Sequence, residues 1–302
     1  MTGPTLSAGQ LAVPVARLER SPFEPRALKS LLLTAGVWAA AIVAAIPLVS
    51  VLYMLAVRGG ARLSASVFVE LPPAGFEMGG GFGNALVGTV VMVGLGGVLS
   101  VPLGILCAVF LAELGPYSRL AEAARFAAKT LTGMPSILAG VFAYAAVVLV
   151  TGTYSAPAGA LALAVLMVPT VVLTAEEAIK AVPKITRDAA YGMGCTRSQV
   201  IWKVLLPTAM PGILTGVMLA VARAAGETAP LLFTALFSSY WLFDGGVPQL
   251  MQPTASLAVL IYNFSGMPFE NQIELAWAAS LVLVLLVLVI NVISRLVGQR
   301  RA

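Results

Sequence analysis

The chain alternates long apolar stretches with short polar connections. Six apolar stretches occur, at residues 31–57, 85–112, 131–151, 157–174, 207–233 and 275–290. About 20 apolar residues in a helix cross a hydrocarbon core of about 30 Å. The apolarity is continuous within each stretch, whereas the strands of a membrane β-barrel would show alternation. The pattern therefore predicts an all-α integral membrane protein with six transmembrane helices.

Composition supports this class and removes several others. Of 302 residues, 59% are hydrophobic and 10% charged, against about 45–50% and about 25% in soluble domains. This profile excludes a disordered chain and a water-soluble enzyme, and it argues against nucleic-acid binding. No histidine is present, which excludes His-dependent triads and the usual zinc sites. Cys107 and Cys195 stand alone, so no disulfide framework or metal site is expected.

The basic residues predict the orientation. Of 18 Lys and Arg, 15 lie in the alternate connections that include both termini, and two, Arg58 and Arg62, lie in the others. By the positive-inside rule both termini are cytoplasmic, with tails at 1–30 and 296–302, and segments 58–84 and 234–272 are external. The 31–57 stretch exceeds a signal-peptide core, so it is a retained first helix.

The external segments are rich in Gly and Pro, and we expect them to be flexible connections. The GGGFG string at 79–83 lacks the Lys-Ser/Thr that follows the glycines of a phosphate-binding loop. No nucleotide site is therefore expected in this chain.

The cytoplasmic segment 176–207 combines charges with apolar positions, and its ends are marked by Pro183 and Pro207. Gly192 and Gly194 allow a sharp turn. The segment predicts a short helix–turn–helix, which is either an ordinary connection or a surface that sits in a groove of a soluble partner.

This segment resembles the EAA loop of binding-protein-dependent ABC importer permeases, E-A-A-x(3)-G-x(9)-I-x-L-P. The same spacing is kept by Asp188, Ala189, Ala190, Gly194, Val204, Leu206 and Pro207, with Asp for Glu and Val for Ile. The resemblance implies a type I (MetI-like) importer permease domain over about 85–295. It also implies that residues near 187–200 form a coupling helix that docks on an ATPase subunit.

Further segments resemble the permeases of phosphate ABC importers, and those of the PstA type in particular. They are LTGMPSILAG at 131–140, VARAAGETAPLLFTA at 221–235 and QPTASLAVLIYN at 252–263. The resemblance implies a multi-pass protein of the bacterial inner membrane. It implies as partners a second permease of the PstC type, two PstB-type ATPase subunits that bind ATP and Mg²⁺, and a periplasmic PstS-type phosphate-binding protein. This chain itself would hold no cofactor.

Arg223 and Glu227 are the charges inside an apolar stretch. They are four residues apart on one helix face, and we expect Arg223 near the middle of the membrane, buried beside Glu227. A buried structural ion pair is one interpretation. The other interpretation is a phosphate-binding site (a phosphate station) on the transport path, because a guanidinium binds phosphate oxygens through two parallel hydrogen bonds. The family resemblance favours the station, with Thr228 as a further donor and Ser136 as a residue that either lines the path or bonds to its own helix.

Other classes of function remain as alternatives. A self-contained secondary anion transporter would use the Arg223–Glu227 pair without ATP, and a permease for another oxyanion would share the same fold. A purely structural subunit would not need Arg223 for transport.

Overall fold

A computed structural model describes residues 25–244 and 246–299 of the chain. It divides into two units, Met1–Tyr53 and Met54–Ala302, and each is described by itself. Most of the tails predicted to be cytoplasmic, 1–30 and 296–302, lies outside the described residues.

The first unit contains one long helix, α1, which spans Pro25–Met54. No charged residue occurs between Lys29 and Arg58. The apolar span runs for 35 residues, Leu28–Arg62, which is more than enough to cross a bilayer. The first predicted helix, 31–57, is therefore confirmed.

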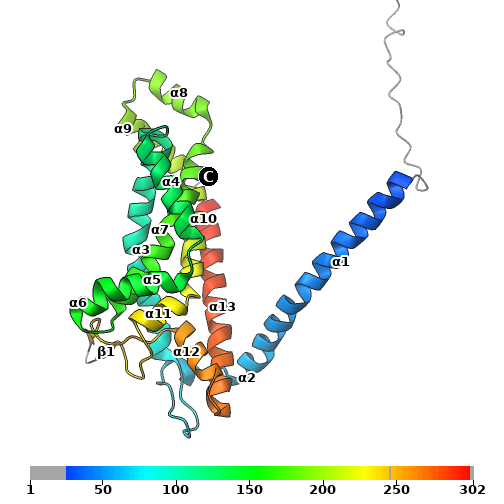
Figure 1. The fold of residues 1–302 in the computed structure, drawn as a ribbon, viewed down its shortest axis with the longest axis vertical. Helices are drawn as coiled ribbons and strands as arrows, with labels where there is room; N and C mark the ends of the chain where they lie inside the picture. Colours follow the sequence, from blue (N-terminus) through cyan, green and yellow to red (C-terminus); the bar gives the residue numbers. More distant parts are fainter. Residues whose placement is uncertain (1–24, 245, 300–302) are drawn as a thin grey trace, which may run out of the picture. The chain divides into compact units, whose positions relative to one another are not determined.

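The second unit is a bundle of helices with one two-stranded ribbon (Figure 1). The helical segments that precede the loop predicted to be cytoplasmic are η1 Leu55–Gly59, α2 Gly60–Arg62, η2 Ala65–Phe68, α3 Gly83–Val109, η3 Phe110–Leu114, α4 Arg119–Thr132, α5 Ser136–Ala143, η4 Tyr144–Val148, α6 Leu149–Thr151 and α7 Ala156–Lys180. They are followed by α8 Lys184–Gly192, α9 Arg197–Gln199, η5 Val200–Leu205, α10 Leu206–Ala225, α11 Ala229–Thr234, α12 Leu257–Ser265 and α13 Glu270–Gln299. Strands β1 Phe243–Asp244 and β2 Val247–Pro248 pair antiparallel.

Five of the six predicted spans are present among the described residues as helices long and apolar enough to cross a membrane. The third, 131–151, was expected to be one helix, and this expectation is wrong. The chain breaks at Gly133–Pro135, and the helices on the two sides, Arg119–Thr132 and Ser136–Thr151, are bent by 106° (Figure 1). Pro135 removes a backbone donor and disfavours helix at the residue before it, which explains the break.

The fifth predicted helix, 207–233, also differs from the expectation. The helical run begins earlier, at Arg197, and ends at Ala225, after which Gly226 and Pro230 flank a break before α11. Pro207 was expected to end the loop but lies inside this run. The π-helical turn η5 directly before it relaxes the hydrogen-bond register that a proline would otherwise disrupt.

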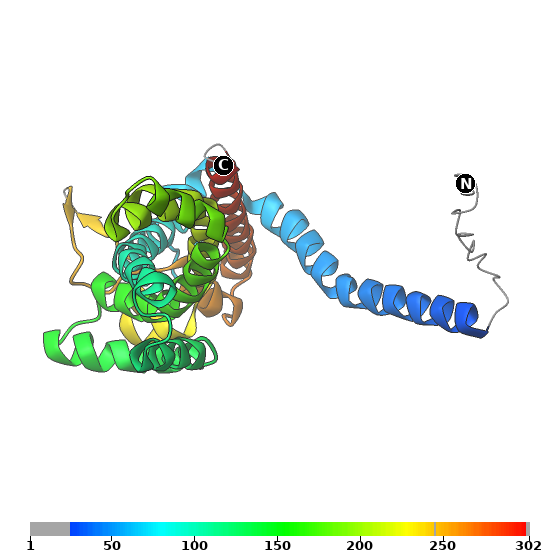
Figure 2. The same cartoon turned by 90° about the horizontal axis from the view of Figure 1, so that it is seen from above.

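Helix α7 is the centre of the bundle and the most buried of the spans. It packs against α3 on one side and α10 on another, at positions where small residues let the backbones approach. A methyl group added at Gly104 would lie 2.6 Å from a Val171 methyl, and one added at Gly212 would lie 2.7 Å from the Ala178 methyl. Figure 2 looks along this bundle and shows α5 running across it.

The external segments are packed structures and not the flexible connections that their composition predicted. Val67 and Phe82 are fully buried, and the Phe82 amide donates to the Val67 carbonyl over 2.8 Å. In the second segment the Thr89 hydroxyl on α3 accepts from the Leu257 amide over 2.9 Å. The glycines serve close packing here, since a side chain at Gly81 would overlap the backbone of Val67.

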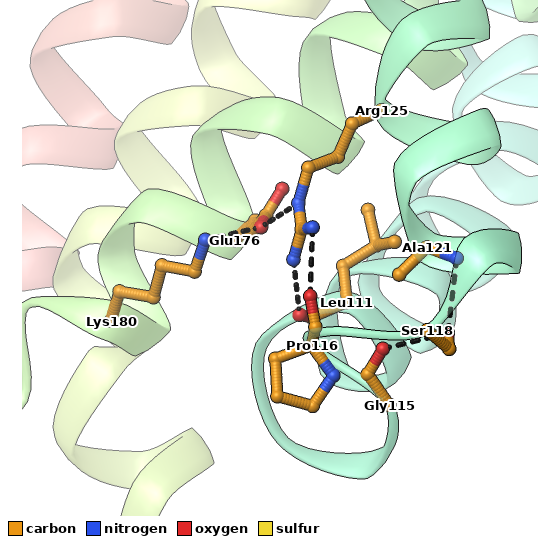
Figure 3. A network of polar contacts seen from close by, with 8 residues as sticks. All are labelled: Leu111, Gly115, Pro116, Ser118, Ala121, Arg125, Glu176 and Lys180. Carbon is orange, nitrogen blue, oxygen red and sulfur yellow. Dashed lines mark hydrogen bonds and ion pairs between the residues drawn. The ribbon is translucent and has the colours of Figure 1, made fainter.

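One arginine ties together the cytoplasmic ends of α3, α4 and α7 (Figure 3). Arg125 on α4 donates to the Glu176 carboxylate over 2.7 Å and to the carbonyls of Pro116 and Leu111 over 2.9 and 2.7 Å. Lys180 adds a second bond to Glu176, of 2.5 Å. Glu176 is 4% exposed, so its charge is stabilised by these two cations rather than by water.

Replacing Gly88 by Ala should destabilise the chain by about 1–3 kcal/mol, because the new methyl group overlaps the Ala255 carbonyl. Gly94→Ala on the same helix is the matched control, since nothing lies within 4 Å of its added carbon. Denaturant unfolding in detergent measures both. Equal stability of the two variants would contradict the packed external segment.

Arg125→Met should cost roughly 3 kcal/mol, because it leaves the buried Glu176 with one cation and frees two carbonyls. Arg119→Met, an exposed arginine on the same helix, is the control. If the ion pair carries the loss, Arg125→Met should cost less in a Glu176→Gln background. An additive double variant would argue against this coupling.

Candidate functional site

The predicted helix–turn–helix is present at the cytoplasmic end. Helix α8 spans Lys184–Gly192, a turn follows, and α9 begins the long run that becomes α10. The coupling helix was expected near 187–200 and instead begins three residues earlier and ends at Gly192. Pro183 precedes α8 with extended ψ, which starts the helix, and Lys184–Thr186 form its first turn.

Gly194 ends α8 through a backbone conformation that favours glycine. Its φ is +85°, its amide donates to the Tyr191 carbonyl over 2.9 Å, and the Cys195 amide donates to the Ala190 carbonyl over 3.2 Å. These two bonds form a Schellman motif. The four-residue spacing between Ala190 and Gly194 is therefore the spacing of a helix C-terminus, which gives the Ala–x(3)–Gly part of the motif a physical basis.

The next helix begins two residues later with a capping box. The Thr196 hydroxyl accepts from the Gln199 amide, and the Gln199 side chain accepts from the Thr196 amide over 2.8 Å. Two orphan donors at the helix start are satisfied in this way. The turn between α8 and α9 is thus specified at both ends, which fixes the direction of α8 relative to α10.

Helix α8 has an inner and an outer face. Ala190 is 1% exposed, and it packs in the core with Val200 and Ile201 from the next helix. On the outer face Ile185 is 77% exposed, and Asp188 and Ala189 are also exposed. Directly after the helix Met193 is 78% exposed and Gly194 is exposed, and so is Pro207 on α10. Leu206 is buried. The motif residues therefore serve two purposes: Ala190 and Leu206 anchor the loop, and Asp188 and Ala189 lie on its surface.

A second ion pair attaches α8 to the bundle. Arg187 lies 2.9 Å from the Glu113 carboxylate in η3, which continues α3, and donates to the Ile179 carbonyl over 2.9 Å. Arg197 donates to the Glu113 backbone carbonyl. The sequence pattern does not predict this pair or the Arg125–Glu176 pair, because each joins residues more than 50 positions apart in the chain.

Arg223 and Glu227 form the expected ion pair, with 3.5 Å between Nε and Oε1. Arg223 lies in the last turn of α10, however, and Glu227 follows the helix break at Gly226. The Arg223 side chain is 42% exposed and that of Glu227 17%. The expectation of a buried Arg223 in mid-helix is therefore wrong for this chain by itself, because α10 ends at Ala225, two residues after Arg223.

The other two predicted pathway residues lie at the starts of short helices. Ser136 is the first residue of α5 and Thr228 directly precedes α11. Neither side chain makes a hydrogen bond with Arg223, Glu227 or any other described residue. The two short helices pack on each other, and a methyl group at Gly140 would lie 2.6 Å from the Pro230 Cα.

This arrangement leaves an accessible guanidinium beside a carboxylate at the break between α10 and α11. A guanidinium of this kind binds oxyanions, and the carboxylate limits how tightly it does so. Among the described residues no group of three or more Cys, Asp or Glu side chains is placed to hold a metal ion.

Among the proteins that the chain is similar to are phosphate transport permeases. The chain is 40% identical to the phosphate transport system permease protein PstA of Yersinia pestis, covering 84% of each chain. It is 41% identical to that of Haemophilus influenzae, with 83% and 87% covered. Against PstA 1 of Mycobacterium tuberculosis the identity is 35% and coverage is 99% and 98%.

Solved ABC transporters share the fold. A chain of the MetNI methionine transporter in inward-facing conformation aligns with a TM-score of 0.57 at 21% identity, over 72% of this chain and 93% of that one. A chain of a bacterial alginate ABC transporter aligns with a TM-score of 0.62 at 17% identity, over 93% and 98%.

The sequence profile of one family, described as the inner membrane component of binding-protein-dependent transport systems, matches residues 100–302. The profile covers the EAA-like loop, both broken helices and the last span. Membership implies ATPase and substrate-binding partners and a membrane location. The chain belongs to the family of binding-protein-dependent ABC importer permeases.

Proposed function

We propose that this chain is a permease subunit of an ATP-driven importer of inorganic phosphate in the bacterial inner membrane. The observation that carries the proposal is the accessible Arg223 guanidinium, paired with Glu227 at the end of α10. The substrate assignment is further supported by relatives named phosphate transport permeases at about 40% identity over most of both chains.

The outer face of α8 docks on an ATPase subunit. Ile185, Ala189 and Met193 are spaced by four residues and form one exposed apolar stripe, as a helix that enters a groove requires. ATP and Mg²⁺ are bound by two such PstB-type subunits and not by this chain. The Arg187–Glu113 pair then transmits displacement of α8 to α3, and the continuous run from Arg197 transmits it to α10.

The exposed side of Arg223 faces the translocation path. Exposing a guanidinium to lipid within the membrane costs free energy, so this side of Arg223 faces water or another protein chain. A second, PstC-type permease covers this side and completes the path. Thr228 and Ser136 contribute hydroxyl groups, since neither is engaged by a described residue. A periplasmic phosphate-binding protein delivers phosphate to the packed external segments.

Transport follows alternating access. Closure of the ATPase pair moves α8, and the motion reaches the path through α3 and α10. Arg223 binds phosphate through its two parallel donors, and Glu227 competes for the same guanidinium so that phosphate is released.

Replacing Ile185 and Met193 together by Asp should lower affinity for the ATPase subunit at least about tenfold, because two exposed apolar side chains become charged at the interface. Val247→Asp, an exposed apolar residue on the external ribbon, is the control. Co-purification of the ATPase with the tagged chain measures the effect. Wild-type co-purification of the double variant would exclude α8 as the docking element.

Arg223→Lys should lower phosphate uptake about tenfold in an assembled complex, because the single ammonium cannot form two parallel bonds. Glu227→Gln should also lower it, by strengthening phosphate retention. Arg119→Lys, at an exposed position of α4, is the control. Uptake is measured with radiolabelled phosphate in proteoliposomes that contain the whole complex.

Three outcomes would contradict parts of this assignment. Wild-type uptake by both variants would favour a structural ion pair. Uptake by this chain without ATPase subunits would indicate a secondary transporter, and preferential uptake of another oxyanion would reassign the substrate.

A further inference from the structure

A polar groove lies at the external end of the second unit, away from α8 and from Arg223. It lies between η1–α2 and the first two turns of α13 and has a volume of about 550 Å³. Its lining combines two arginines, two glutamates, one tryptophan and three apolar residues: Val57, Arg58, Ala61, Arg62, Glu270, Ile273, Glu274 and Trp277. The proposed transport function uses none of them.

The groove is held open by a close helix contact on one side and a polar network on the other. A side chain at Gly59 would lie 2.7 Å from the Trp277 carbonyl oxygen, so η1 rests directly on α13. Arg62 donates to the Asn271 side chain over 3.2 Å and to the Gly79 carbonyl over 3.1 Å, and it lies 3.8 Å from Glu274. Arg62 is therefore occupied by the fold.

Arg58 and Glu270 are not occupied in this way. Among the described residues neither forms an ion pair, although both line the same groove. The Arg58 guanidinium lies 5.7 Å from the centre of the Trp277 ring, which orients it without neutralising it. The groove thus presents one free cation and one free anion, with Glu274 beside them.

The depth of the groove matches the boundary of a bilayer. Arg58 and Arg62 lie at the external end of the span Leu28–Arg62, and Glu270 begins the span that ends at Ile293. Seven residues, or about 10 Å of helix, separate Glu270 from Trp277. Tryptophan is enriched at this level, where its ring contacts both headgroups and acyl chains.

An apolar cavity adjoins the groove on the membrane side. It has a volume of about 210 Å³ and shares Ile273 and Trp277 with the groove. Its other lining residues are Ile261, Ser265, Ala276 and Ser280, none of which is charged. A ligand with a charged end and an apolar end would therefore fit across the ridge that Ile273 and Trp277 form.

We propose that this groove binds the headgroup of phosphatidylethanolamine from the external leaflet. The lipid phosphate contacts Arg58, the ammonium contacts Glu270 and Glu274, and part of an acyl chain enters the adjoining cavity. A headgroup that carries both a negative phosphate and a positive ammonium matches a groove that offers both a free cation and a free anion. Phosphatidylglycerol would offer a phosphate to Arg58 but no ammonium to Glu270, and the quaternary ammonium of phosphatidylcholine cannot donate hydrogen bonds to the carboxylates.

The test is titration of the purified full-length chain, together with any subunits that co-purify, followed by native mass spectrometry. The titrants are phosphatidylethanolamine, phosphatidylglycerol, phosphatidylcholine and inorganic phosphate. We expect phosphatidylethanolamine to bind about tenfold more tightly than the other two lipids, and Arg58→Gln and Glu270→Gln each to weaken it about tenfold. Inorganic phosphate should not displace it.

Arg119→Gln and Glu122→Gln on α4 are the matched controls, since each removes one exposed charge of the same sign at the cytoplasmic end. Both should leave lipid binding unchanged. Circular dichroism establishes that each groove variant is folded, and the two groove variants are independent, so that failure of one to fold leaves the other as a test. Equal binding of phosphatidylglycerol, competition by inorganic phosphate, or unchanged binding in the folded groove variants would overturn the proposal.

Discussion

Inside a bilayer every backbone N–H and C=O group must find its partner within the protein, and the architecture of this chain follows from that constraint. The long spans satisfy it by continuous helix. The two breaks satisfy it locally: Gly133 and Met134 donate to Thr130 and Leu131, and Gly226 and Glu227 donate to Arg223 and Ala224. A helix can therefore stop at these places without stranding polar groups in hydrocarbon.

Because both breaks are tolerated, two short helices are free to turn across the bundle. Helices α5 and α11 pack through Gly140 and Pro230, and the end of α10 carries Arg223 to the surface of the chain. The Arg223 side chain is 42% exposed there, beside Glu227, and is therefore accessible to an anion.

The charged residues of this membrane protein fall into two kinds, those that are neutralised by a partner and those that remain accessible. At the cytoplasmic end Glu176 is buried and held by Arg125 and Lys180, and Glu113 is paired with Arg187, so these charges stabilise the attachment of α4 and α8 to the bundle. Arg223 and Arg58 remain accessible, one beside a single carboxylate and the other over a tryptophan ring. In a membrane protein accessible charges indicate binding surfaces, whereas neutralised charges hold the helices of the bundle together.

The sequence by itself determined the membrane class, five of the spans, the presence of a helix–turn–helix within 176–207 and the pairing of Arg223 with Glu227. These depend on local properties: hydrophobic length, the helix end that Gly194 requires, and a spacing of four residues. Tertiary structure decided the 106° bend at Pro135, the continuity of the helix through Pro207, the packing of the external glycines and the partners of Arg125 and Arg187. Each of these depends on which distant segment supplies the neighbouring atoms. Composition alone therefore could not distinguish a flexible glycine from a closely packed one, or a solvated charge from a buried one.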